Sequence, residues 1–236
     1  MKKTALTLII NFILIGVFGQ WTEFRLGFNS GLFAFTGKST EAVSFINSSR
    51  TLNGPYTNNP YGSQNGICYG ISGNLKRVSK KNFIFGLDLG YEKVRSRVSI
   101  NEVNQYNMPT VLLYKASGKT FLNVSFINTH LFAGYRVVLH SLHFDITGGV
   151  DIGHCLQAKE KGSADAINGL AYKTAVDRKT IKTDIRPRIQ LSADYKKFGA
   201  YVGYARGLTS YKSGYMGEAN DCFSKIFRFG LTYLLH

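Results

Sequence analysis

Apolar and polar residues alternate along most of this chain beyond residue 20, and this period of two limits the possible folds more than any other feature. Successive side chains of a β-strand point to opposite faces, so the pattern predicts strands that each have one apolar face. Helical periodicity is almost absent from the same segments. The clearest strand covers 83–91, and its apolar positions are Phe83, Phe85, Leu87, Leu89 and Tyr91.

The alternating segments number eight, and the connections between them are short and long in turn. The predicted strands cover 24–32, 67–75, 83–91, 130–137, 142–152, 185–195, 199–204 and 227–235. The short connections are 79–82, 139–141 and 196–198, and the long ones are 37–66, 101–118, 157–182 and 210–224. Short periplasmic turns and long outer loops are typical of barrels in bacterial outer membranes. An even number of strands also brings both ends of the chain to the periplasmic side.

The alternation sorts the charged residues onto one face. Seven acids and six bases fall opposite the apolar face, so their charges nearly balance: Glu23, Arg25, Lys76, Asp88, Glu92, Arg136, Asp145, Asp151, Asp184, Arg186, Arg188, Asp194 and Arg228. A closed barrel that is apolar outside suits lipid, and buried charges of both signs can pair inside it. The sequence therefore predicts an all-β fold, an eight-stranded antiparallel up-and-down transmembrane β-barrel with a plugged polar lumen. The alternative, a soluble secreted β-sandwich, would not bury so many charges.

The N-terminal segment has the features of a secretory signal. A basic start at Lys2 and Lys3 precedes a mostly apolar run at 4–18, and Val17 and Gly19 occupy the positions that a signal peptidase reads. We expect residues 1–19 to be a cleaved signal peptide and residues 20–236 to form one barrel domain in the bacterial outer membrane. An uncleaved N-terminal anchor is the alternative. Because an exported chain meets little nucleic acid, we expect no nucleic acid partner despite the formal net charge of +15.

Three segments carry a resemblance to a known class of proteins, namely 144–162 (FDITGGVDIGHCLQAKEKG), 186–212 (RPRIQLSADYKKFGAYVGYARGLTSYK) and 227–235 (FRFGLTYLL). They resemble the outer-membrane β-barrel domain proteins of Bacteroidota, small barrels of OmpA/OmpX-like or PorT-like type. The resemblance covers residues 20–236 and implies the barrel fold, whereas its motifs imply little about function. One departure is the last residue: many such barrels end in an aromatic residue, and this chain ends in His236.

The cysteines and one proline are local features of the predicted outer rim. Cys68, Cys155 and Cys222 fall at the outer ends of strands or in the last long loop. The compartment permits a disulfide, for which Cys155 and Cys222 are the favoured pair; free thiols are the equal alternative. Pro187 lacks the N–H that a strand inside a sheet needs, so it predicts a bulge near the outer rim.

A row of cations continues the outward phase of the strand at 83–91. Lys93, Arg95 and Arg97 follow Tyr91 at every second position. A tilted strand of this length spans ~23 Å, close to the ~25 Å apolar band of such barrels, so the cations emerge near the lipid headgroups. We expect them to contact lipopolysaccharide phosphates, with an ordinary solvated strand end as the alternative.

No pattern in the sequence indicates catalysis. The chain has no HExxH and no CxxC, so we expect no catalytic, cofactor or metal site. We predict an integral outer-membrane protein with a structural or surface-interaction role, whose partners are membrane lipid and lipopolysaccharide. The alternatives are a PorT-like accessory barrel, which would bind other envelope or secretion proteins, and a lipid-modifying outer-membrane enzyme. A diffusion porin is disfavoured, because eight strands enclose only enough space for side chains.

Overall fold

The computed structural model describes residues 19–49, 54–107, 110–213 and 220–236, and their regular structure is β-strand. The predicted signal peptide, residues 1–19, lies outside this part except for Gly19. The strands are β1 (Gly19–Thr36), β2 (Val43–Ser49), β3 (Tyr56–Thr57), β4 (Gln64–Ser79), β5 (Phe83–Asn107), β6 (Thr110–Leu139), β7 (Leu142–Ala166), β8 (Ala171–Asp177), β9 (Thr183–Tyr195), β10 (Phe198–Arg206) and β11 (Phe223–Leu234).

Eight of these strands form a closed ring. The order is β1, β4, β5, β6, β7, β9, β10 and β11, and β11 pairs with β1 along Arg25–Thr36 to close the ring. All neighbours in the ring are antiparallel, so the backbone groups of the ring pair with one another and leave no open edge. The predicted eight-stranded up-and-down barrel is confirmed, with β2, β3 and β8 outside the ring.

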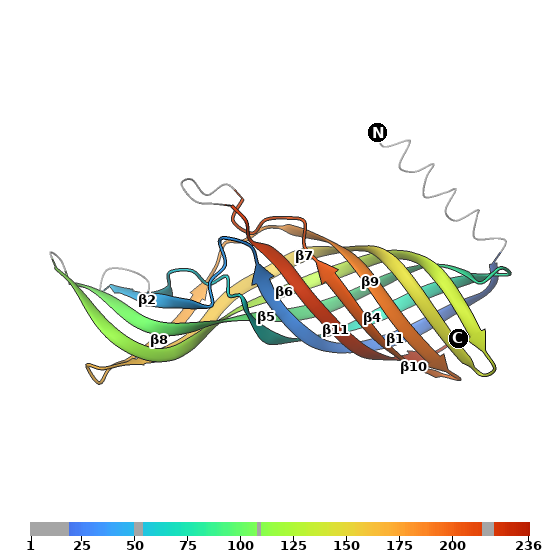
Figure 1. Cartoon of the computed structure of the whole chain (residues 1–236), viewed down its shortest axis with the longest axis horizontal. Helices are drawn as coiled ribbons and strands as arrows, with labels where there is room; N and C mark the ends of the chain where they lie inside the picture. Colours follow the sequence, from blue (N-terminus) through green and yellow to red (C-terminus); the bar gives the residue numbers. More distant parts are fainter. Residues whose placement is uncertain (1–18, 50–53, 108–109, 214–219) are drawn as a thin grey trace.

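Three tight turns lie at one end of the barrel, together with the C-terminus (Figure 1). They join β4 to β5, β6 to β7, and β9 to β10, and each contains one residue with a positive φ. These residues are Asn82 (61°), His140 (54°) and Lys196 (53°). Left-handed residues of this kind let a hairpin reverse within two or three residues while keeping the twist of its strands.

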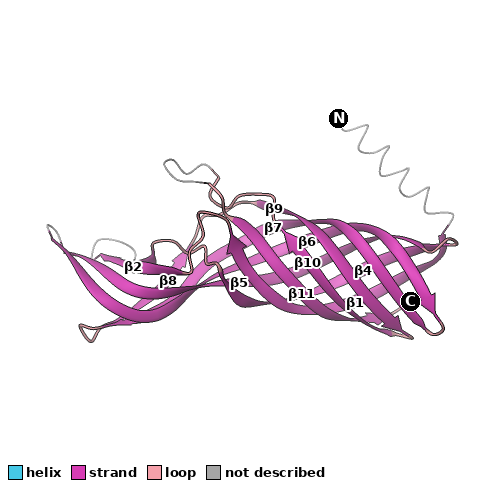
Figure 2. Ribbon diagram, viewed as in Figure 1, coloured by secondary structure: helices cyan, strands magenta, loops and turns pink. Residues whose placement is uncertain are grey.

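At the opposite end, β5, β6 and β7 continue beyond the ring and build a second structured region, which we call the extension (Figures 1 and 2). These strands are 25, 30 and 25 residues long. β2 pairs in parallel with β5, β3 pairs with β2, and β8 pairs with β7, so the extension is a curved sheet in the order β3-β2-β5-β6-β7-β8.

The long outer connections lie at this end as predicted, but much of their length is strand rather than loop. Most of 101–118 and 157–182 is strand, and 37–66 contains β2 and β3. The pairing register shifts between Ile100 and Glu102 and again between Ser125 and Phe126. Each such bulge moves the following side chains to the other face, so a strict period of two is lost although the strand continues.

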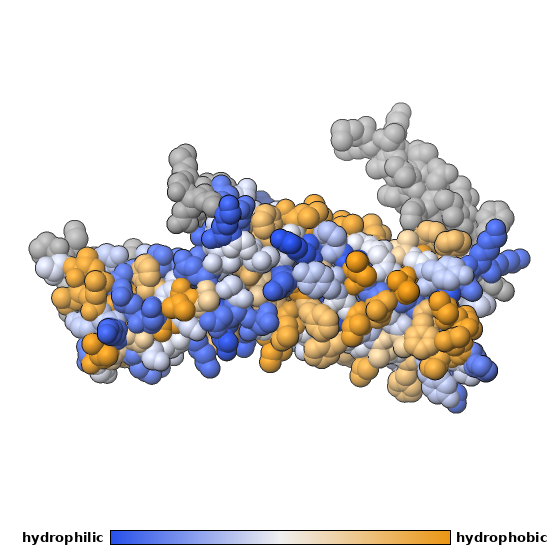
Figure 3. Space-filling view, in the orientation of Figure 1, coloured by the Kyte–Doolittle hydropathy of each residue, from blue (hydrophilic) through white to orange (hydrophobic). Residues whose placement is uncertain are grey.

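The outside of the ring is apolar. Leu87, Leu89 and Leu231 are 37%, 57% and 67% exposed, and Figure 3 shows hydrophobic side chains spread over this half of the molecule. Exposed tyrosines lie near both rims: Tyr135, Tyr195 and Tyr233 near the tight turns, and Tyr91 and Tyr204 near the extension. Such aromatic bands mark the two membrane interfaces of a barrel. In the described residues, no helix has the length and apolar character to span a membrane.

The predicted bulge at Pro187 is absent. On one side, Pro187 pairs with Val150 of β7 in unbroken register. On the other side, the last pair between β9 and β10 is Arg188 with Ala205, so Pro187 has no partner on β10. The proline therefore stands just past the last residue of β9 that pairs with β10. A position with a single neighbouring strand needs no bulge to accommodate the missing N–H.

The interior changes character in layers along the strands that run through both regions. On β5 the inward side chains are charged at Asp88 and Glu92, apolar at Val94, polar at Ser96 and apolar again from Val98 onward. The second apolar layer forms the core of the extension and comprises Ile46, Val98, Ile100, Val103, Ala164, Ala166 and Tyr172. Between the two apolar layers, the buried Glu160 carboxylate accepts hydrogen bonds from Thr57 and Arg178.

Candidate functional site

The residues predicted to line the lumen lie inside the ring and form two clusters of ion pairs. The cluster nearer the tight turns consists of Glu23, Arg25, Lys76, Arg136, Asp145 and Asp194. Arg136 is fully buried, with Nη1 at 2.5 Å from Glu23 Oε1 and Nε at 2.7 Å from Asp145 Oδ1. Lys76 Nζ lies 2.5 Å from Asp145 Oδ2. Charges that are this deeply buried are tolerated because each is paired and hydrogen-bonded.

The second cluster lies farther from the turns. Its members are Asp88, Glu92, His130, Asp151, Asp184, Arg186, Arg188 and Arg228. Arg228 Nε lies 2.6 Å from Glu92 Oε1, and Arg188 Nη1 lies 3.3 Å from Asp151 Oδ1. The cavity among these residues has a volume of about 30 Å³, roughly the share of one water molecule in the liquid. Side chains thus fill this part of the lumen.

The outermost part of the lumen is apolar, which corrects the prediction of a polar lumen throughout. The ring of Phe35 packs edge-on against Phe33, Tyr61 and Tyr211, with centroids 5.1, 5.2 and 4.8 Å away. Tyr61 and Tyr211 come from segments predicted as outer loops, so this part of the plug was not visible in the strand pattern. The Tyr211 hydroxyl donates to Asp184 Oδ2 at 2.7 Å, and burial together with this carboxylate raises the pKa of Tyr211 well above its ordinary value.

All three cysteines are free thiols in the structure, so the predicted Cys155–Cys222 disulfide is not formed there. Cys68 and Cys222 are fully buried in the apolar cluster, and Cys155 packs against it from a partly exposed position. They act as small apolar side chains that fill the plug. Burial raises the pKa of Cys222 to about 12. Among the described residues, no group of three or more His, Cys, Asp and Glu side chains could hold a metal ion.

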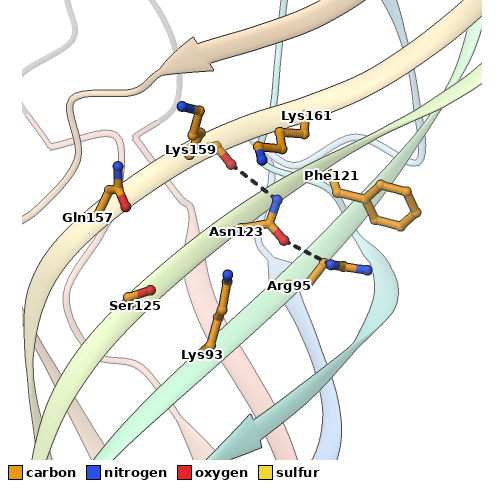
Figure 4. A pocket seen from close by; sticks show the side chains of 8 residues that line it. All are labelled: Lys93, Arg95, Phe121, Asn123, Ser125, Gln157, Lys159 and Lys161. Atoms are coloured by element: carbon orange, nitrogen blue, oxygen red, sulfur yellow. Dashed lines mark hydrogen bonds between the residues drawn. The ribbon is translucent and has the colours of Figure 1, made fainter.

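The outward face at the junction of the ring and the extension carries a basic cavity, which we call the cradle (Figure 4). It has a volume of about 380 Å³ and is lined by Lys93 and Arg95 of β5, Phe121, Asn123 and Ser125 of β6, and Gln157, Lys159 and Lys161 of β7. None of the eight lining residues is acidic, so four cations share one open concavity. An anion there would meet several charge-assisted hydrogen-bond donors.

Hydrogen bonds fix the floor of the cradle. Arg95 donates from Nε to Asn123 Oδ1 at 2.9 Å, and Asn123 donates from Nδ2 to the Lys159 carbonyl at 3.3 Å (Figure 4). The Arg95 guanidinium also lies 5.0 Å from the centre of the Phe121 ring. The cradle lies directly beyond the outer aromatic band, because Tyr91 donates from its hydroxyl to Ser125 Oγ at 3.1 Å.

The structure brings together only two of the three cations predicted for lipopolysaccharide contact. Lys93 and Arg95 line the cradle, whereas Arg97, also outward, donates from Nε to Gln64 Oε1 at 2.8 Å and does not line it. Lys159 and Lys161 were missed. If the alternation of 142–152 is continued along β7, odd-numbered residues such as Lys159 and Lys161 point into the lumen. The bulge in β7 opposite Ser125 and Phe126 reverses this phase and turns both lysines outward.

A closed ring with an apolar outer face, aromatic bands at both rims and an ion-paired interior defines a transmembrane β-barrel of the outer-membrane type. No family model matches the sequence, and no curated protein matches it. Among solved structures, the chain is similar to Neisserial surface protein A, with 11% identity, a TM-score of 0.39, and 91% of this chain and 99% of that chain covered.

Two further solved structures are similar at the same level. Ail, the attachment invasion locus protein of Yersinia pestis, was solved with the heparin analogue sucrose octasulfate; it has 8% identity, a TM-score of 0.33 and coverage of 91% and 97%. The outer membrane protease OmpT of Escherichia coli has 10% identity, a TM-score of 0.33 and coverage of 91% and 96%. The assignment of the barrel rests on the strand ring and its two faces.

Proposed function

We propose that this chain is an integral protein of the bacterial outer membrane, in which a closed barrel anchors a folded extension for a structural or surface-interaction role. The filled lumen is the observation that carries this proposal. Two ion-pair clusters and an aromatic plug follow one another along the axis, and a narrow interior so filled gives solutes no path. The proposed role is therefore that of an anchor and binding surface rather than of a porin.

Planar-bilayer recording tests this proposal directly. The purified protein should show no stable large conductance, and it should migrate faster on gels when unheated than when boiled, because a closed barrel resists detergent. A steady, nanosiemens-scale pore in the unmodified protein would contradict the anchor role.

The proposed partner of the cradle is lipopolysaccharide, with Lys93 and Arg95 holding phosphate groups and Arg97 adding charge beside them. The position of the cradle just beyond Tyr91 supports this contact, because lipid phosphates begin at the outer aromatic band.

The variant Lys93→Ser/Arg95→Ser should retain less lipopolysaccharide through purification. The matched control is Lys80→Ser/Lys81→Ser, which removes the same charge from an exposed turn at the other end of the barrel. Equal retention in both variants would refute the contact.

The resemblance to Bacteroidota barrels suggests a second candidate, an accessory barrel of PorT-like type that binds secretion proteins. The exposed, folded extension supports it, since such a surface can hold a protein partner. Cross-linking in intact cells followed by solubilisation distinguishes the two. Capture of one stoichiometric envelope protein would favour the accessory role, whereas lipopolysaccharide alone would favour the anchor.

A further inference from the structure

The cradle is one part of a larger array of cations on the outward face of β5, β6, β7 and β8. Register aligns the side chains in rows across the strands. Arg95 pairs with Asn123 and Asn123 with Lys159; in the next row, Arg97 pairs with Phe121 and Phe121 with Lys161. Cations therefore flank a polar or aromatic centre in each of these two rows.

The array continues outward past the cradle. In the following row, Lys119 pairs with Ser163 and Ser163 with Lys173, and both lysines are exposed. Consecutive rows are two residues apart, or ~6.7 Å along a strand, so the rows from Lys93 to Lys119 extend for roughly 20 Å. An array of this length exceeds what a single phosphate can contact.

Few acids oppose these cations. Within the described residues, the one ion pair made by the array joins Lys159 Nζ to the exposed Asp177 at 3.9 Å, a weak contact. Asn123, Ser125, Gln157 and Ser163 supply neutral hydrogen-bonding groups between the charges, and Phe121 supplies an apolar ring. Sugar rings that bear anionic groups suit this surface. Their hydroxyls can hydrogen-bond the neutral polar side chains, their flat apolar faces can lie on Phe121, and their anionic groups can pair with the regularly spaced cations.

From this arrangement we propose that the face binds a linear polyanionic glycan, a chain of sugars bearing phosphate or sulfate groups, that runs outward along β5–β7 from the membrane surface. The proposal deepens the proposed function, since its inner end is the cradle. The paired strands hold the rows at fixed spacing, so the site favours a ligand whose charges repeat along its length over separate small anions.

The test measures binding of heparin-derived decasaccharide, heparin-derived disaccharide and deacylated lipopolysaccharide to the detergent-purified full chain. Three pair variants are compared: the inner pair Lys93→Ser/Arg95→Ser, the outer pair Lys119→Ser/Lys173→Ser, and the control pair Lys80→Ser/Lys81→Ser. We expect the inner and outer pairs each to weaken decasaccharide or deacylated lipopolysaccharide binding by roughly three- to tenfold, with the disaccharide bound far more weakly by all proteins. Tighter binding of the decasaccharide would identify sulfate as the anionic group of the ligand, and tighter binding of deacylated lipopolysaccharide would identify phosphate.

Other outcomes separate this proposal from the proposed function. If the outer pair leaves binding of both long ligands unchanged while the inner pair weakens it, the site ends at the cradle: the linear-glycan proposal falls and the lipopolysaccharide contact survives. If neither pair has an effect, both fall. If the control pair weakens binding as much as the outer pair, the ligand senses net charge alone, and the linear-glycan site is refuted. A retained heat shift on gels verifies that each variant is folded.

Discussion

The barrel and the extension share the three strands β5, β6 and β7, yet their interiors are opposites. Inside the ring, β5 presents Asp88 and Glu92, whereas inside the extension it presents Val98 and Ile100. The outward face of β5 changes in the opposite way: it is apolar as far as Tyr91 and cationic from Lys93 onward. Lipid requires an apolar exterior and leaves polar groups for the interior, while water allows the usual apolar core. The surrounding solvent, rather than the strand, thus decides which face is charged.

The largest effect should come from breaking the ion pairs of the ring. Arg136→Ala leaves Glu23 and Asp145 buried beside one cation fewer, which should cost about 3–5 kcal/mol. The temperature at which the gel mobility shift is lost should fall markedly. Arg206→Ala, at an exposed outward position, is the control and should leave that temperature unchanged. A wild-type heat shift in Arg136→Ala would show that the lumen charges do not hold the barrel together.

In the extension, the corresponding change removes an apolar side chain. Ile46 is fully buried in the core of the extension, so Ile46→Ala should cost about 2–5 kcal/mol locally. Limited proteolysis should cut the extension faster, while the heat shift of the barrel stays the same. Val43→Ala, at an exposed position of the same strand, is the control. Simultaneous loss of both regions would mean that they unfold as one unit.

A single arginine on the outward face probes the boundary between lipid and water. Leu87→Arg places a charge in the lipid-facing band, which should cost about 2–4 kcal/mol near the bilayer centre. Ser163→Arg places the same side chain on the outward face of the extension and should be mild. Urea unfolding in lipid vesicles measures both. Equal effects would argue against a membrane boundary between them.

The prediction with the smallest effect on stability concerns thiol chemistry at the junction of the two regions. The folded pKa of Cys222 is raised to about 12, so its neutral form persists until the pH approaches that value. At pH 8 the shift alone should slow alkylation roughly a thousandfold, because the thiolate is the nucleophile. Iodoacetamide labelling with mass spectrometry should therefore modify the partly exposed Cys155 first. Faster labelling of Cys222 would place it outside the plug.

The strand pattern predicts the ring because lipid enforces a period of two on every crossing. It also predicts which charges face inward, but not their partners. Arg188 could pair with Asp184 or Asp194 on its own strand or with an acid of a neighbouring strand, and only the folded ring shows that Asp151 of β7 is the partner. Arg25 reaches Asp194 on a strand that is not its neighbour in the ring. Such contacts depend on how the ring closes, which no local pattern encodes.

The extension and half of the cradle escape the same reasoning for a different reason. Bulges shift the register of β5 against β6 and of β6 against β7, so the phase set by the barrel no longer applies beyond them. Glu102, Leu113 and Lys159 then look like loop residues. The bulge in β7 lies at Leu156. An alternation that starts again with Gln157 pointing outward places Lys159 and Lys161 outward as well.

The uninterrupted passage of β5, β6 and β7 out of the ring has a mechanical consequence. Three hydrogen-bonded strands join the two regions without a flexible linker, so the extension cannot reorient relative to the barrel as a tethered domain would. Any ligand held on its outward face keeps a constant height and heading relative to the bilayer. A probe attached at Ser163 should therefore tumble with the whole detergent particle, and pulling on the extension should load the barrel wall directly.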